Sequence, residues 1–190
     1  MKTKNSLHRA GFTILEMMVV IVIVSLLGTL VLFGYRAFTD RLSVSAASQD
    51  IAIAVRQTQA YGLSVKQVGQ GSGIFNTGYG IYFNTADPTH YTIFADANPD
   101  GVFDQGDTVV ETDSTRDNVP ITSVCDAGTC SPQGATAVSI LFIRPKPDAI
   151  IRFSASGGTF LDDFVRIILT STQGTASTVS VSSTGEVSTQ

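Results

Sequence analysis

The sequence predicts an α+β protein in which one long N-terminal helix is followed by a small antiparallel β-sheet head. Three observations support this fold class. Residues 12–34 carry a single charged side chain, Glu16, and an apolar stripe with helical spacing follows them. After about residue 70, apolar and polar residues alternate with a period of two instead. The mean hydropathy of +0.23 is therefore a property of the front of the chain and not of the whole.

The composition excludes some classes of protein. The chain has 190 residues, of which 43% are hydrophobic and 15% charged, and this is too apolar for a disordered protein. Twelve basic residues stand against sixteen acidic ones, a net charge of −4. This balance argues against a general nucleic-acid-binding protein, because such proteins carry an excess of Lys and Arg.

The apolar segment 12–34 is long enough to cross a bilayer, since a helix of this length measures about 34 Å. Basic residues precede it at Lys2, Lys4 and Arg9, which favours a cytoplasmic N-terminus. A secretory signal peptide would have a shorter apolar tract and small residues at its cleavage site. An ordinary anchor leaves Glu16 unexplained, because an acid inside a span costs about 2.5–3.5 kcal/mol.

The stretch Gly11-Phe12-Thr13-Ile14-Leu15-Glu16 resembles the class III signal of type IV prepilins and type II secretion pseudopilins. As in that family, a short basic leader ends in Gly, Phe follows, and Glu is the fifth residue after the junction. Tyr35 also stands where pilins often carry Tyr, whereas Phe33 replaces a Pro found in many major pilins. The resemblance covers about the first 35 residues and implies a pilin-like fold.

The resemblance also implies a processing and assembly route. A prepilin peptidase would cut between Gly11 and Phe12, removing leader 1–11, and Phe12 would be N-methylated. The product would be a single-pass protein of the bacterial cytoplasmic (inner) membrane, with its N-terminus inside and its head in the periplasm or outside. Its partners would be other pilin or pseudopilin subunits, an inner-membrane assembly platform and membrane lipid. In the filament, Glu16 would face the amine of Phe12 of a neighbouring subunit.

Beyond the transmembrane helix 12–34, we expect an outer amphipathic half-helix at 35–67 and a β-rich head at 68–190. Residues 54–66 are similar to the H pseudopilin or FimT-like minor pilin branch. Five glycines predict a loop over Val68–Gly80. Predicted strands are Gly80–Asn84, Tyr91–Ala95, Thr108–Thr112, Ile121–Val124, Ala137–Ile143, Ala149–Ser154, Phe164–Thr170 and Thr178–Ser182, with a further edge around Val187.

A twelve-residue acidic segment begins at Asp96 and has the spacing of an EF-hand-type calcium loop. Its oxygen-bearing positions are Asp96, Asn98, Asp100, Asp104 and Asp107, with Gly101 at the sharp turn and Val102 offering a carbonyl. Four carboxylates this close repel each other unless a cation or water screens them. The alternative is a solvated hairpin turn, because Asp, Asn, Pro and Gly all favour turns.

The two cysteines, Cys125 and Cys130, enclose four residues beyond the membrane segment. An even pair in an oxidising compartment is typical of a disulfide. A metal pair would need further Cys or His ligands, and a redox motif would more often be C-x-x-C. The alternative is two free thiols, if the exterior is poorly oxidising.

The sequence offers no convincing catalytic motif. It has no phosphate-binding glycine loop before a helix and no G-x-S-x-G elbow, and His90 is the sole histidine after the leader. We therefore expect a non-enzymatic structural subunit, a minor one, of a type II secretion pseudopilus or type IV pilus.

The alternative is a DNA- or surface-binding minor pilin in competence or adhesion, with a basic patch at Arg144, Lys146, Arg152 and Arg166. Removing the leader leaves a side-chain charge of −7, which argues against nucleic acid as a partner. A third hypothesis is a membrane-anchored enzyme or dockerin-like module.

Overall fold

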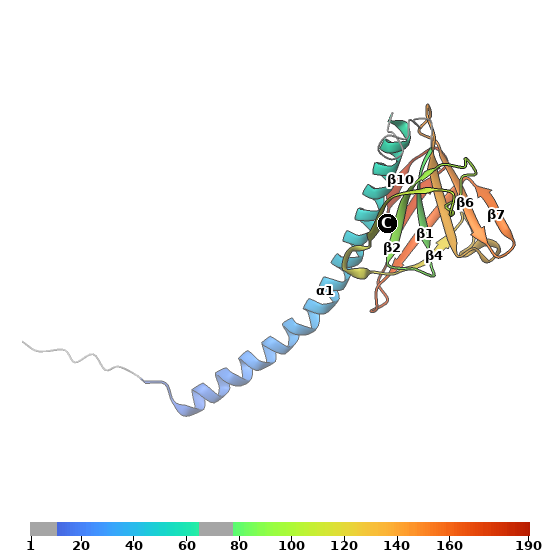
Figure 1. Cartoon of the computed structure of the whole chain (residues 1–190). Helices are drawn as coiled ribbons and strands as arrows, with labels where there is room; N and C mark the ends of the chain where they lie inside the picture. The colour runs from blue at the N-terminus through green and yellow to red at the C-terminus, as the bar shows by residue number, and fades with distance from the viewer. Residues whose placement is uncertain (1–10, 65–77) are drawn as a thin grey trace, which may run out of the picture. The chain divides into compact units, whose positions relative to one another are not determined.

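The structure is a computed structural model that describes residues 11–64 and 78–190, apart from the side chains at 33, 34 and 37. Most of the predicted leader 1–11 and most of the predicted loop Val68–Gly80 lie outside the described residues. The described chain forms two units, which divide between Thr39 and Asp40. Helix α1 (Ile14–Leu63, 50 residues) begins in the first unit and ends in the second (Figure 1).

The part of α1 in the second unit packs through one stripe of small and branched residues. Its buried side chains are Val44, Ala47, Ser48, Ile51, Ala54, Val55 and Thr58. They recur at helical spacing, so each faces the same side of the helix. The amphipathic pattern expected for the outer half-helix is therefore present from Val44 to Thr58.

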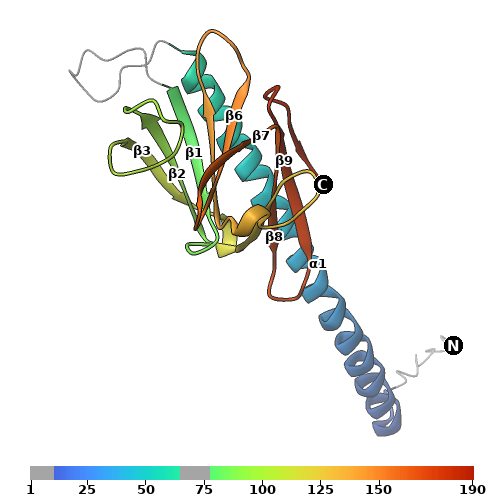
Figure 2. The same ribbon diagram turned by 90° about the vertical axis from the view of Figure 1, so that its right-hand side faces the viewer.

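The head contains two antiparallel sheets, which Figures 1 and 2 show from two sides. The six-stranded sheet has the order β3-β2-β1-β5-β6-β7, with β1 (Gly78–Asn84), β2 (His90–Asp96), β3 (Thr108–Ser114), β5 (Ala137–Phe142), β6 (Ala149–Ala155) and β7 (Gly158–Asp162). The four-stranded sheet has the order β10-β9-β8-β4, with β4 (Ile121–Cys125), β8 (Phe164–Thr170), β9 (Ala176–Ser182) and β10 (Val187–Thr189). Short 3-10 turns lie at η1 (Arg116–Asn118) and η2 (Pro132–Gly134). The α+β pilin-like fold class is thus confirmed.

One core joins the packed half of α1 to both sheets. Alternate residues of the strands turn toward the helix, as a period of two requires. Among the fully buried ones are Ile81, Phe83, Ile140, Ile151, Phe153, Val165, Ile167 and Val181. The opposite face of the six-stranded sheet is partly covered by the segment between β2 and β3, where Phe103 lies 5.0 Å from the ring of Tyr82 and 5.2 Å from that of Phe94, between ring centroids.

Two sequence expectations were wrong in detail. Strand β7 was not predicted, because its residues are mostly exposed and show no buried alternation to signal it. Gly78 belongs to strand β1 and not to a loop, so the strand begins two residues earlier than predicted, and Gly80 lies within it as predicted. Gly80 is required there by packing, since a Cβ at this position would lie 2.5 Å from Cζ of Phe94.

Candidate functional site

The beginning of α1 is fixed by a capping interaction. The backbone N–H of Glu16 donates to Oγ1 of Thr13, 3.2 Å away, one residue before the helix begins. Thr13 and Glu16 have the spacing of a capping box, in which Ser or Thr is followed three residues later by Glu. Sequence reasoning overlooked this role of Thr13, although the T-x-x-E pattern could have revealed it. The cap holds Glu16 in the first helical turn, while Phe12 is 74% exposed just ahead of it.

The next residues form an apolar helical segment that no other described residue covers. Residues Ile14–Leu32 have a mean hydropathy of 2.7, none of them is buried, and the segment is long enough to cross a membrane. The hydroxyl groups of its two hydroxyl residues bond to carbonyls of the same helix. Ser25 donates to the carbonyl of Ile21 and Thr29 to that of Ser25, both at 2.8 Å. Because these hydroxyl donors are already hydrogen-bonded within the helix, they need no partner from a lipid or other apolar surrounding.

A family model for the prokaryotic N-terminal methylation motif matches residues 7–32. The chain carries a class III prepilin signal. This match supports the type IV pilin and pseudopilin family, which was the family inferred from the residues, and leaves the branch within it open. No curated protein and no solved structure matches the chain significantly. The motif implies processing by prepilin peptidase and assembly with other pilin subunits, and with the apolar helix it supports a membrane-anchored pilin.

In the head of this pilin-like chain, the structure gathers the acidic residues of the segment between β2 and β3. Asp96 ends β2, is 3% exposed, and accepts the N–H of Gly101 through Oδ2 at 3.1 Å. Asp100 accepts the N–H of Val102 at 2.9 Å, and Asp104 accepts that of Gly106 at 2.6 Å. The carboxylates are thus oriented by backbone groups of the loop itself.

Two further predicted ligands, Asn98 and Asp107, take different positions. The side-chain nitrogen of Asn98 lies 3.2 Å from Oδ2 of both Asp100 and Asp104. Asp107 accepts the N–H of Ala97 with Oδ1 and that of Asp104 with Oδ2, both at 3.0 Å, so its carboxylate ties the two ends of the loop together. Within residues 11–64 and 78–190, no three His, Cys, Asp or Glu side chains converge in a metal-binding arrangement.

The electrostatics of this loop reflect its carboxylates. Burial raises the pKa of Asp96, and the charges of Asp107 and Asp100 raise it further. Burial likewise raises the pKa of Asp107, with Asp104 and Asp100 adding to the effect. Backbone N–H groups that donate to both carboxylates act in the opposite direction. The loop therefore holds negative charge at a cost, because burial disfavours the ionised form.

Cys125 and Cys130 form a disulfide, with an S–S distance of 2.06 Å. The turn that they enclose is also closed by hydrogen bonds, because the N–H of Asp126 donates to the carbonyl of Thr129 at 2.9 Å. The backbone N–H groups of Thr129 and Gly128 donate to the carboxylate of Asp126 and lower its pKa, with a smaller contribution from Arg166. The pair is part of a compact turn after β4.

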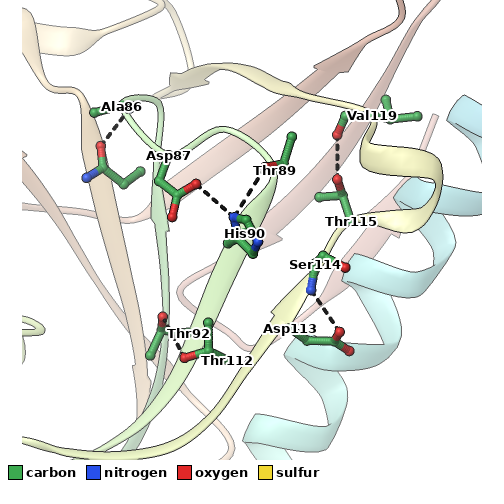
Figure 3. Close-up of polar contacts among 11 residues, drawn as sticks. Ala86, Asp87, Thr89, His90, Thr92, Thr112, Asp113, Ser114, Thr115 and Val119 are labelled. Atoms are coloured by element: carbon green, nitrogen blue, oxygen red, sulfur yellow. Dashed lines mark hydrogen bonds and ion pairs between the residues drawn. The ribbon is translucent and has the colours of Figure 1, made fainter.

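His90 has neighbours suited to a turn. It is exposed at the start of β2, and its Nδ1 lies 2.8 Å from Oδ1 of Asp87 and 3.2 Å from Oγ1 of Thr89 (Figure 3).

The four residues suggested as a basic patch are not grouped on one sheet. Arg152 lies on β6, whereas Arg166 lies on β8 of the other sheet and donates to the carbonyl of Asp126 at 3.1 Å. The pilin motif suggests a structural protein.

Proposed function

We propose that this protein is a minor subunit of a type II secretion pseudopilus or a type IV pilus, stored in the cytoplasmic membrane and assembled through α1. The observation that carries the proposal is the helix segment Ile14–Leu32, which is entirely exposed while the same helix is packed from Val44 onward. Such a surface needs lipid before assembly and neighbouring helices after it. The preference for a minor subunit rests on the likeness of residues 54–66 to the H pseudopilin and FimT-like branch.

Glu16 has the central role in this proposal. After cleavage between Gly11 and Phe12, the methylated amine of Phe12 becomes the N-terminal cation of each subunit. A carboxylate in an apolar helix bundle is strongly stabilised by a nearby cation, and the demand for that cation favours one axial register between subunits. The cap at Thr13 supports the proposal, because it begins the helix between these two residues and leaves both exposed.

The decisive experiment compares Glu16→Ala and Glu16→Gln with Asp163→Ala in the bacterium that encodes the protein. Asp163 is a suitable control, because it is exposed and acidic but lies in the head. We expect all three variants to lose the leader normally, as measured by the mass of the purified chain. Both Glu16 variants should enter the sheared filament fraction at least about tenfold less, since an uncompensated buried charge costs several kcal/mol.

Normal incorporation of Glu16→Gln would overturn the role of the charge, because Gln retains the size of Glu. Uncleaved wild-type chain in the presence of the host prepilin peptidase would overturn the processing step. The position of a minor subunit would be contradicted if this chain were the most abundant component of the filament.

The DNA-binding alternative gains no support from the head. Arg166 already donates to a backbone carbonyl, and Nε of Arg152 is buried within the sheet face. An electrophoretic mobility shift assay at low salt should show no retarded complex with duplex DNA, since such binding depends on Lys and Arg contacts to phosphate.

A further inference from the structure

A small cavity lies in the head where strands β1 and β2 meet the turn that joins them. Its volume is 190 Å³, and the segment between β2 and β3 closes one side of it. The lining residues are Tyr82, Asn84, Asp87, His90, Tyr91, Thr92 and Phe103. Sites for drug-sized ligands measure about 300–1,000 Å³, so this cavity suits a smaller ligand, of the size of a single ring.

Two aromatic rings form the apolar wall of the cavity. Tyr82 on β1 is paired with Thr92 on β2, and both alternate with core residues, so their side chains leave the sheet on the face opposite the core. The ring of Phe103 lies 5.0 Å from that of Tyr82, between centroids, at an angle of 44°. The backbone N–H of Phe103 donates to Oγ of Ser139 on β5 at 3.1 Å. This hydrogen bond holds the segment that carries Phe103 against the sheet, so the wall has a fixed position.

Polar groups around the turn between β1 and β2 form another part of the lining. Oδ1 of Asn84 accepts the N–H of Ala86 at 2.9 Å. Nδ1 of His90 lies 2.8 Å from Oδ1 of Asp87, and Figure 3 shows these two side chains directed toward each other. The protein therefore orients these groups before a ligand arrives, which lowers the entropic cost of ordering them on binding.

The same contacts leave hydrogen-bonding atoms available to a ligand. In the described part of the chain, Nε2 of His90 and Oδ2 of Asp87 have no partner. The side chains of His90 and Asp87 are 47% and 65% exposed, so a ligand from solution can reach them. A carboxylate oxygen accepts, an imidazole nitrogen donates or accepts according to its tautomer, and the hydroxyl of Thr92 does both. The cavity thus offers acceptors and donors within a few residues.

The charges of the lining argue against an ionic ligand. The described residues that line the cavity include no Lys or Arg, and the carboxylate of Asp87 repels an anion such as phosphate. A cation would bind best to a desolvated carboxylate, whereas that of Asp87 is largely exposed and already contacts His90. A neutral ring that has carbon surface on one face and hydroxyl groups around its edge matches both the aromatic wall and the polar groups.

We propose that this cavity binds one pyranose ring of a neutral carbohydrate. The rings of Tyr82 and Phe103 pack against C–H groups of the sugar, while Asp87 and His90 hold its hydroxyl groups. Beyond the cavity, Oγ1 of Thr92 lies 3.5 Å from Oγ1 of Thr112 on the exposed strand β3. This polar surface continues to the edge of the sheet, so the site can take one unit of a longer polysaccharide. The inference goes beyond the proposed function, since the cavity lies wholly in the head.

Saturation-transfer NMR on the full chain tests the proposal, in a detergent without a sugar head group. The probes are the methyl glycosides of glucose, galactose, mannose and N-acetylglucosamine. At least one of them should receive saturation at its ring C–H protons, with a dissociation constant of about 1–10 mM, as expected for so small a ligand. Inorganic phosphate and tetramethylammonium chloride at equal concentration should not displace it.

Two substitutions remove different parts of the site. Asp87→Ala should weaken binding of that glycoside at least about fivefold, because a charged acceptor of its hydroxyl groups is lost. Tyr82→Leu should weaken it at least about threefold, because the aromatic wall is lost while an apolar side chain remains. Asp163→Ala is the matched control, since Asp163 is an exposed acid that lies between β7 and β8 and outside the cavity. It should leave the dissociation constant unchanged.

The exposed position of Asp87 keeps the test valid, because its side chain makes no contact with the core and Asp87→Ala should have the Tm of the wild type. The proposal would be overturned if none of the glycosides received saturation from the wild-type chain. It would also be overturned if Asp87→Ala and Tyr82→Leu bound the glycoside as tightly as Asp163→Ala does. Displacement of the glycoside by tetramethylammonium or phosphate would show that the site prefers an ion, which contradicts the ligand class.

Discussion

The two ends of helix α1 have the same backbone conformation but different surroundings. From Ile14 to Leu32 no residue is buried, and nearly every side chain is apolar. From Val44 to Thr58 the buried residues form one stripe, and the rest of the surface is polar or partly exposed. The difference shows that the first segment depends on an apolar environment outside the chain, whereas the second obtains one from its own sheets.

The largest expected effect contrasts two isoleucines that lie two positions apart on this helix. Ile51 is 1% exposed in the core, whereas Ile53 is 62% exposed. Ile51→Ala should lower the free energy of unfolding of the head by about 2–5 kcal/mol, because it removes buried methyl groups and leaves a cavity. Ile53→Ala should change it by less than about 0.5 kcal/mol. Urea unfolding of the full chain in detergent measures both, and equal effects would contradict the burial of the stripe.

A somewhat smaller effect should distinguish two glycines of α1. A Cβ at Gly62 would lie 2.5 Å from the carbonyl oxygen and 2.7 Å from Cβ of Phe142, whereas a Cβ at Gly28 would have no atom within 4 Å. Gly62→Ala should therefore destabilise the head by about 1–3 kcal/mol, since the backbone of β5 has to move. Gly28→Ala should leave the Tm of the head unchanged. A stable Gly62→Ala variant would show that the end of the helix is not held close to β5.

The smallest effect concerns pH at the packed half of the helix. Tyr91 is 7% exposed, and its hydroxyl lies 3.4 Å from Oδ2 of Asp113. Burial makes the largest contribution to its raised pKa, which is about 12, and the negative charges of Asp113, Glu111 and Asp50 raise it further. The folded state therefore keeps a proton that the unfolded chain loses above its ordinary pKa of about 10. The stability that this provides is complete below pH 10 and is lost as the pH rises toward 12.

Unfolding in urea at several pH values between about 9 and 11.5 measures this dependence. Tyr91→Phe should weaken the loss of stability over that range, because Phe has no proton to release. The other tyrosines with raised pKa values, Tyr79 and Tyr82, should retain a part of it. An identical pH dependence in the wild type and in Tyr91→Phe would contradict the buried, acidic surroundings of the hydroxyl.

Local patterns predicted much of this molecule. The uncharged tract with Glu16 near its start indicated the anchor, and the change from helical spacing to a period of two located most of the strands within two residues. Each of these patterns depends on neighbours along the chain, since one face of a helix or strand has to be apolar wherever it is buried. The same holds for the spacing of the acidic loop, in which Gly101 was expected at the sharp turn and has φ +78°.

Other features were decided by contacts between residues far apart in the sequence. Strand β7 is formed by pairing with β6 and has little apolar alternation of its own, and the need for Gly at position 80 comes from the ring of Phe94, which occupies the space of a side chain there. Asp107 closes the loop, and Asp96 has one buried oxygen without a donor, which spacing alone could not reveal. The sequence alone determined which segments are apolar and with what period, because that information is local. The tertiary structure decided which groups are buried against which partners, because burial depends on the whole chain folding together.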